Sequence, residues 1–153
     1  MADANHVDVG IRRAETGDGA ALADLMTELG YPTRASEMEM RMEAISADKN
    51  YATFVAVSEG KVCGMIGTFT CYGYEHNNPG GRILVLVVSE KMRGRGVGHG
   101  LIAAAEADFA QRNVRRVAVN ARFERTKAHE FYERLGYKKN GVRLVKELAV
   151  SAD

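Results

Sequence analysis

The sequence lacks the features that mark several large classes of protein. Its 153 residues include two cysteines, Cys63 and Cys71, and no Cys/His cluster with zinc spacing, so we expect neither a disulfide framework nor a bound metal. No apolar run approaches the roughly 18 residues that a membrane helix needs, and the segment before Val9 lacks the apolar stretch of a signal peptide. These absences predict a cytoplasmic protein with free thiols and no membrane partner.

An excess of charge of either sign is also missing. The chain has 21 Lys and Arg against 20 Asp and Glu, a net charge of +1. No basic field therefore points to nucleic acid as a partner. Hydrophobic residues make up 46% of the chain and charged residues 27%, which is ordinary for a globular protein. The length fits one domain over residues 1–153.

Periodicity predicts a mixed α/β fold in which helices cover a central sheet. Apolar residues at helical spacing indicate helices, and apolar or alternating runs between turn residues indicate strands. The run 83–88 is apolar at every position, so we expect it to be buried on both faces. The predicted order is βααβββαβαββ, with strands at 9–13, 53–57, 62–72, 83–88, 116–120, 137–139 and 142–148, and helices at about 16–29, 34–46, 97–112 and 126–135.

The glycine-rich segment 93–100, Arg-Gly-Arg-Gly-Val-Gly-His-Gly, follows a predicted buried strand and opens a helix. A helix start offers free N–H groups and a positive dipole end, which suit a phosphate. Glycines let the backbone approach a ligand, and arginines add cationic donors. The dinucleotide and P-loop motifs both fail here. The pattern R-x-x-G-x-G, met by Arg93, Gly96 and Gly98, predicts a phosphate loop; the alternative is a plain glycine turn with solvated arginines.

Two blocks of the chain resemble signatures of the GNAT superfamily of acetyltransferases. Residues 86–98, LVVSEKMRGRGVG, are similar to L-x-V-x-P-x-x-R-G-x-G-x-G, with Glu90 at the proline position. Residues 128–137, AHEFYERLGY, resemble A-x-x-F-Y-x-x-x-G-F/Y. The blocks stand in the family's order, with one predicted strand between them. The resemblance implies the GNAT fold over nearly the whole chain and an acetyl-CoA-dependent N-acetyltransferase of the small bacterial type.

The resemblance also implies which residues would hold acetyl-CoA. Backbone groups of Leu86 and Val88 would pair with the pantetheine arm as an added strand does. Amides of the glycine loop would hold the pyrophosphate. Arg125 stands where the family often has Asn, and it could reach a cofactor phosphate. The complete set implied for cofactor binding is Leu86, Val87, Val88, Arg93, Gly94, Arg95, Gly96, Val97, Gly98, His99 and Arg125.

Tyr132 is the candidate general acid, because a phenol with a pKa near 10 can protonate a departing thiolate. The residue also belongs to an apolar helical stripe with Ala128, Phe131 and Leu135, which by itself favours a core tyrosine; the resemblance reverses that preference. The amide of Val88, at a distorted point of the strand, is the expected oxyanion donor.

The general base stays open. Some relatives carry Glu at the position of Leu84, so that base is missing here. The candidates are Tyr72, Glu75 and His76 in the segment before the run 83–88, or a water relay. Histidine as a residue type titrates near neutrality, which makes His129 a further candidate, but its place one turn before Tyr132 and directly after Ala128 favours packing.

The acceptor class follows only in outline. Selectivity is expected from the helices over 22–46 and the loop 73–81, with Tyr31, Tyr72 and Tyr74 at the mouth. The sequence favours transfer of an acetyl group to a primary amine of a small molecule, by direct attack in a ternary complex. The alternatives are acetylation of a protein or peptide, and a non-catalytic acyl-CoA-binding regulatory module. The acceptor's identity, the acyl group and homodimer formation are left open.

Overall fold

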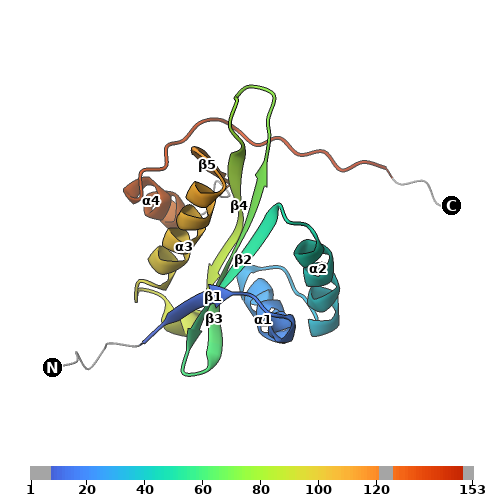
Figure 1. Cartoon of the computed structure of the whole chain (residues 1–153). Helices are drawn as coiled ribbons and strands as arrows, with labels where there is room; N and C mark the ends of the chain where they lie inside the picture. The colour runs from blue at the N-terminus through green and yellow to red at the C-terminus, as the bar shows by residue number, and fades with distance from the viewer. Residues whose placement is uncertain (1–7, 121–125, 150–153) are drawn as a thin grey trace. The chain divides into compact units, whose positions relative to one another are not determined.

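The computed structural model describes residues 8–120 and 126–149. The chain divides into two compact units, Met1–Val119 and Asn120–Asp153, and each is described by itself. In the first unit, short 3-10 turns occupy Thr16–Asp18 and Glu90–Met92. Its strands and helices follow the order β1 (Gly10–Arg13), α1 (Gly19–Leu29), α2 (Ala35–Ala47), β2 (Tyr51–Ser58), β3 (Lys61–Cys71), β4 (Gly80–Val88), α3 (Val97–Gln111) and β5 (Arg116–Val119) (Figure 1).

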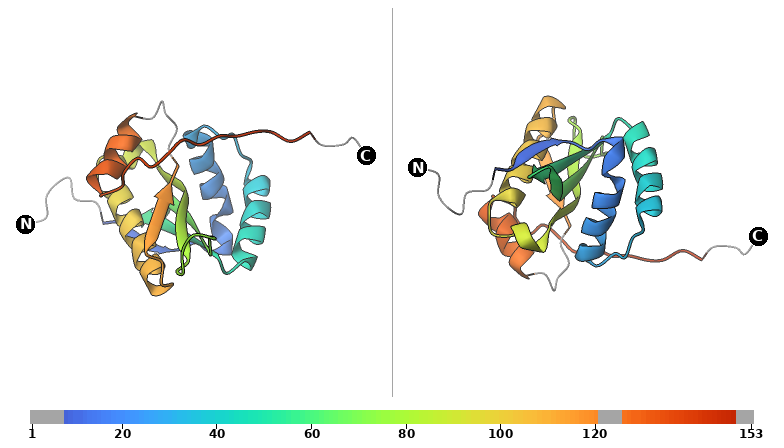
Figure 2. Two further views of the ribbon diagram at one scale, coloured as in Figure 1. Left: turned by 90° about the horizontal axis from the view of Figure 1, so that it is seen from above. Right: turned by 90° about the horizontal axis from the view of Figure 1, so that it is seen from below.

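The described strands of the first unit form one sheet in the order β1-β2-β3-β4-β5. Neighbouring strands are antiparallel except for β4 and β5, which are parallel. Helices α1 and α2 cover one face, and α3 covers the other (Figure 2). This is the mixed α/β fold that the sequence predicts.

Each face of the sheet has its own apolar layer. Toward α1 and α2, side chains of the helices pack on β2, β3 and β4, through Leu22, Leu25, Met38, Val55, Met65 and Val87. Toward α3, the buried positions Leu101 and Phe109 lie at the predicted helical spacing. Gly81 of β4 faces α3, since a Cβ there would lie 2.7 Å from the Phe109 ring.

The turn after α1 shows why the sequence predicts the end of this helix correctly. Gly30 has φ +115°, a left-handed conformation that costs glycine little. Its N–H donates to the Thr27 carbonyl, and the Tyr31 N–H donates to that of Met26. The pair of bonds is a Schellman cap, which satisfies carbonyls that the helix end leaves free.

The second unit contains α4 (Thr126–Arg134), followed by residues 135–149 without helix or strand. The predicted strands at 137–139 and 142–148 are therefore wrong. Their apolar side chains are 70% to 90% exposed, at Val142, Leu144, Val145 and Leu148. The alternating pattern is present, but a strand needs a partner backbone, and the described residues of this unit supply none.

Candidate active site

Strand β4 changes its pairing halfway along. It pairs with β5 only from Gly80 to Ile83, although it pairs with β3 as far as Val88. The register with β3 shifts between Gly67, opposite Val85, and Thr68, opposite Ile83. Leu84 is thus an extra, bulged residue, and it is 53% exposed. The expectation that the run 83–88 is buried on both faces is wrong: the bulge exposes Leu84, and of the other five residues only Ile83 and Val87 are fully buried.

Beyond the bulge, alternate backbone groups of β4 point away from β3. The Ser89 N–H donates to the Cys63 carbonyl over 2.8 Å. Hydrogen-bonded and non-bonded pairs alternate in an antiparallel ladder. Val88 opposite Gly64, and Leu86 opposite Ile66, are therefore non-bonded pairs. Their N–H and C=O groups face the edge that β5 does not cover. The distortion of the strand lies at Leu84, four residues before Val88, and not at Val88 as the sequence suggested.

The glycine loop joins this strand to α3. Gly94 and Gly96 have φ of +76° and +80°, and neither has another atom within 4 Å of a Cβ built there. Glycine is thus required at both by backbone conformation and not by space. Gly96 is the residue before α3, and its carbonyl accepts the N–H of Gly100 over 3.1 Å. The first N–H groups of α3 have no partner within the helix.

The side chains of the loop differ in what they do. Val97 is buried and anchors the start of α3 near Gly64, where a Cβ would lie 3.3 Å from it. Arg93 is exposed, and its Nε donates to the Val88 carbonyl over 3.2 Å. Arg93 therefore ties the loop back to β4, a role that the motif did not reveal. Arg95 and His99 are exposed on the same loop and first turn.

Tyr132 lies in α4 of the second unit, half-buried among aromatic rings. Its ring centroid is 5.3 Å from that of Phe131 and 5.6 Å from that of Tyr137. Burial raises the pKa of Tyr132 to about 12, above the value near 10 expected from the sequence. The phenol therefore keeps its proton at neutral pH. Arg125 lies outside the described residues.

The candidate bases lie in different surroundings. Tyr72, Glu75 and His76 are exposed between β3 and β4, and the His76 ring contacts the Arg116 guanidinium. His129 is half-buried in α4, as the packing interpretation predicts.

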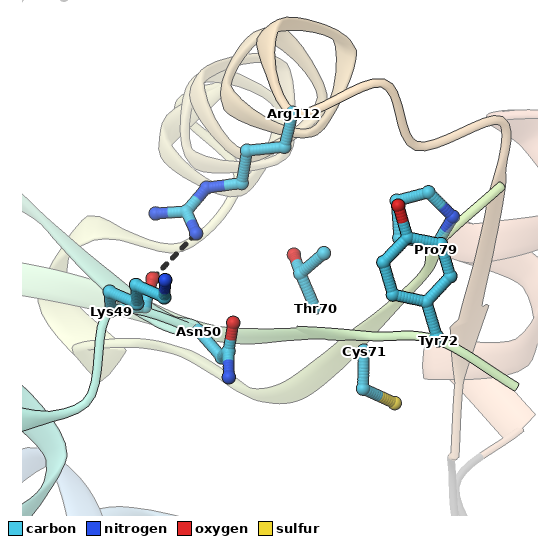
Figure 3. A pocket seen from close by; sticks show the side chains of 7 residues that line it. All are labelled: Lys49, Asn50, Thr70, Cys71, Tyr72, Pro79 and Arg112. Carbon is cyan, nitrogen blue, oxygen red and sulfur yellow. Dashed lines mark hydrogen bonds between the residues drawn. The ribbon is translucent and has the colours of Figure 1, made fainter.

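Two of the hollows on the first unit border segments that the sequence singled out, the loop 73–81 with Tyr72 and the glycine loop. One of about 450 Å³ lies at the Gly80 end of β4, at the opposite end of that strand from the glycine loop (Figure 3). In it Arg112 donates to the Lys49 carbonyl over 2.7 Å and to Asp108 over 2.9 Å, so its charge is already paired. The other, of about 320 Å³, borders the loop at Arg95 and Gly96 and reaches Ile11 of β1.

Within residues 8–120 and 126–149, no group of three His, Cys, Asp or Glu side chains could hold a metal ion. Among the helices in this same part of the chain, none is both long and apolar enough to span a membrane.

Comparison with known proteins identifies the family of the chain. The sequence profile of the acetyltransferase (GNAT) family matches residues 20–137. The chain belongs to the GNAT family. This confirms the resemblance of the two sequence blocks, both of which lie largely within the match.

Individual relatives agree with the family. Over 101 residues the chain is 36% identical to the aminoalkylphosphonate N-acetyltransferase of Salmonella typhimurium, and the match spans 66% of each protein. A GNAT family acetyltransferase from Staphylococcus aureus has a TM-score of 0.79 at 26% identity, over 92% of this chain and 98% of that one. An aminoglycoside N-acetyltransferase, AAC(6')-Iy, in complex with CoA has a TM-score of 0.85 at 18% identity, over 97% and 100%. The last likeness shows the fold alone.

Proposed function

We propose that this protein transfers an acetyl group from acetyl-CoA to a primary amine of a small molecule, by direct attack in a ternary complex. The observation that carries the proposal is the second half of β4, where Leu86 and Val88 turn backbone groups toward an edge that β5 leaves uncovered. The strand then leads into a glycine loop and the start of a long helix. Family membership supports acetyltransferase chemistry.

The edge and the loop fit the two chemically different parts of acetyl-CoA. An extended arm with amide groups can pair with Leu86 and Val88 in the manner of an added strand. A pyrophosphate suits the free N–H groups from Val97 onward and the positive end of the α3 dipole. Gly94 and Gly96 keep the approach to these groups open, since no side chain stands there. Acetyl-CoA supplies the activated acetyl group when it is bound.

Two groups of the chain would serve the transfer itself. The N–H of Val88 points to the uncovered edge and would donate a hydrogen bond to the developing oxyanion. Tyr132 would give its proton to the departing thiolate, as the carbon–nitrogen bond forms and the carbon–sulfur bond breaks. A pKa of about 12 makes the phenol a weaker acid than the value near 10 expected from the sequence, so the transfer depends on the basicity of the departing thiolate. The proton of the attacking ammonium would go to Tyr72, Glu75 or His76 in the segment between β3 and β4, or to a water relay.

The small-molecule acceptor is supported by the Salmonella relative, whose name specifies an aminoalkylphosphonate as its substrate. The proposal is tested by release of free thiol from acetyl-CoA with a panel of small amines and, beside it, lysine peptides. We expect release with at least one small amine and none with the peptides. Thiol release with peptides alone would reassign the acceptor. If acetyl-CoA raises Tm but neither small amines nor peptides are acetylated, the result would favour the non-catalytic binding module.

A further inference from the structure

Arg82 occupies an unusual place in the sheet. Gly81 faces α3, because a Cβ built there would lie 2.7 Å from the Phe109 ring. Successive strand residues point to opposite faces of the sheet. Arg82 therefore points to the face that α1 and α2 cover. On that face the helices pack over Val85 and Val87, whereas Arg82 is exposed. The Arg82 guanidinium thus lies on the face of the sheet that α1 and α2 cover, but at a part of β4 that lies beyond these two helices.

No described residue neutralises the charge of Arg82. Arg12, Arg13 and Arg112 each pair with a buried carboxylate, Asp18 or Asp108, at 2.8 to 2.9 Å. In the described part of the chain Arg82 has no hydrogen bond or ion pair. A cation without a counter-ion, placed on the sheet near a substrate edge, is poised for an external anion.

The neighbours of Arg82 form an apolar floor. It stands opposite Phe69 in β3 and Ala118 in β5, and paired residues share a face of the sheet. The Phe69 ring contacts Tyr51 of β2 at a centroid distance of 4.7 Å. The exposed Leu84 follows two residues later. None of these four neighbours is acidic.

We propose that Arg82 binds an anionic group of the acceptor, so that the enzyme selects small amines that carry a phosphonate or a carboxylate. The inference rests on the proposed function, because it places the reacting amine at the edge beside the Val88 N–H. Arg82 is six residues earlier, and the bulge at Leu84 leaves five steps of the ladder, about 17 Å along the strand at 3.3 Å per residue. The long arginine side chain and a short acceptor span this distance together. A guanidinium offers paired donors that match either anion in a bidentate contact.

The test compares three amines that differ only in the group at the far end of the same two-carbon chain. These are 2-aminoethylphosphonate, β-alanine and ethanolamine, the last with a neutral hydroxyl. We expect the wild-type enzyme to prefer at least one of the two anionic amines to ethanolamine by tenfold or more in kcat/KM. Arg82→Gln should lower kcat/KM for that anionic amine by about 10- to 100-fold, mainly through KM. The value for ethanolamine should stay within about threefold.

Two further variants make the result specific. Arg82→Lys keeps the charge but loses the bidentate contact, so it should fall between wild type and Arg82→Gln. Arg115→Gln removes the same charge from an exposed position just before β5 and should leave the preference unchanged. An equal loss for all three amines in Arg82→Gln would overturn the inference, as would a wild-type enzyme that does not prefer the anions.

The failure of the proposed function would be visible separately. If wild type acetylates none of the three amines, calorimetric titration of 2-aminoethylphosphonate and β-alanine into the acetyl-CoA-saturated protein replaces the kinetic readout. Binding of either anion that is lost in Arg82→Gln and kept in Arg115→Gln would support the role of Arg82 even without turnover. Absence of binding to wild type, or equal binding to both variants, would overturn it.

Discussion

The two halves of β4 use one strand backbone in different ways. Residues 80–83 pair with β3 on one side and β5 on the other, so the strand there is a closed part of the sheet. From Leu84 to Val88, β3 is the only pairing strand among the described residues of this unit, and alternate backbone groups face the edge that β5 leaves free. A binding edge can thus be formed when a neighbouring strand ends early. No special side chain is needed for it, and only a bulge and a following glycine loop mark the change.

Loss of the Tyr132 hydroxyl should have the largest effect of the variants considered, and it tests side-chain chemistry while the backbone edge of β4 stays intact. Tyr132→Phe keeps the ring that contacts Phe131 and Tyr137 but removes the proton donor. We expect kcat to fall by about 10² to 10⁴-fold, provided that thiolate departure limits the rate. The affinity for acetyl-CoA should stay within about twofold, because β4 is untouched. Steady-state kinetics and calorimetry on the same variant measure both, and full activity with a lowered Tm would return Tyr132 to a packing role.

The glycine loop should come next in size. In Gly96→Asp a carboxylate and a Cβ enter a position with φ of +80°, and in Gly98→Asp they enter the first turn of α3. Both variants should weaken acetyl-CoA binding by at least about tenfold, since a like charge meets the phosphates. Arg93→Ala should weaken acetyl-CoA binding less, because one donor of Arg93 is already used in its hydrogen bond to the Val88 carbonyl. Calorimetric titration of folded variants gives the order, and unchanged affinity in both aspartates would contradict a phosphate loop.

The closed half of β4 should respond in stability and not in binding. At Gly81 a new methyl group would lie 2.7 Å from the buried Phe109 ring, so Gly81→Ala should lower the free energy of unfolding by about 1 to 3 kcal/mol. Gly80→Ala is the matched control, since its Cβ would meet only the Cys71 carbonyl at 3.8 Å. Urea denaturation measures both. Weakened acetyl-CoA binding in a folded Gly81→Ala would blur the division between the two halves.

The smallest expected effect is the pH dependence of stability that comes from Tyr132, and it is absent at neutral pH. Tyr132 has a folded-state pKa of about 12 against an ordinary value of 10.0. Below pH 10 both folded and unfolded chains hold the proton, so stability is fully present. Between pH 10 and 12 the unfolded chain loses it first, and stability falls as pH rises. The free energy of unfolding of the wild type minus that of Tyr132→Phe should therefore decrease between pH 10 and pH 12. A flat difference would mean that the phenol is not buried.

The sequence predicted the elements that carry their own local signals. The helix end at Gly30 and the start of α3 after Gly96 are examples, because glycines in left-handed conformations mark both. The final strands at 137–139 and 142–148 were predicted wrongly, since alternation shows what a strand would bury but not whether a partner exists. The bulge at Leu84 and the free charge of Arg82 depend on pairing across the sheet, which residue spacing along one strand does not contain.

In the proposed function, the backbone of Leu86 and Val88 holds the acetyl-CoA arm. Amide hydrogen exchange of β4, followed residue by residue by NMR with and without acetyl-CoA, tests it most directly. At 100 times the dissociation constant, a ligand that must leave before the edge opens can slow exchange up to about 100-fold. With acetyl-CoA bound, we expect amide exchange at Leu86 and Val88 to be at least tenfold slower. The change at Val85 and Val87, which already pair with β3, should be smaller. A raised Tm with no selective slowing at Leu86 and Val88 would contradict it.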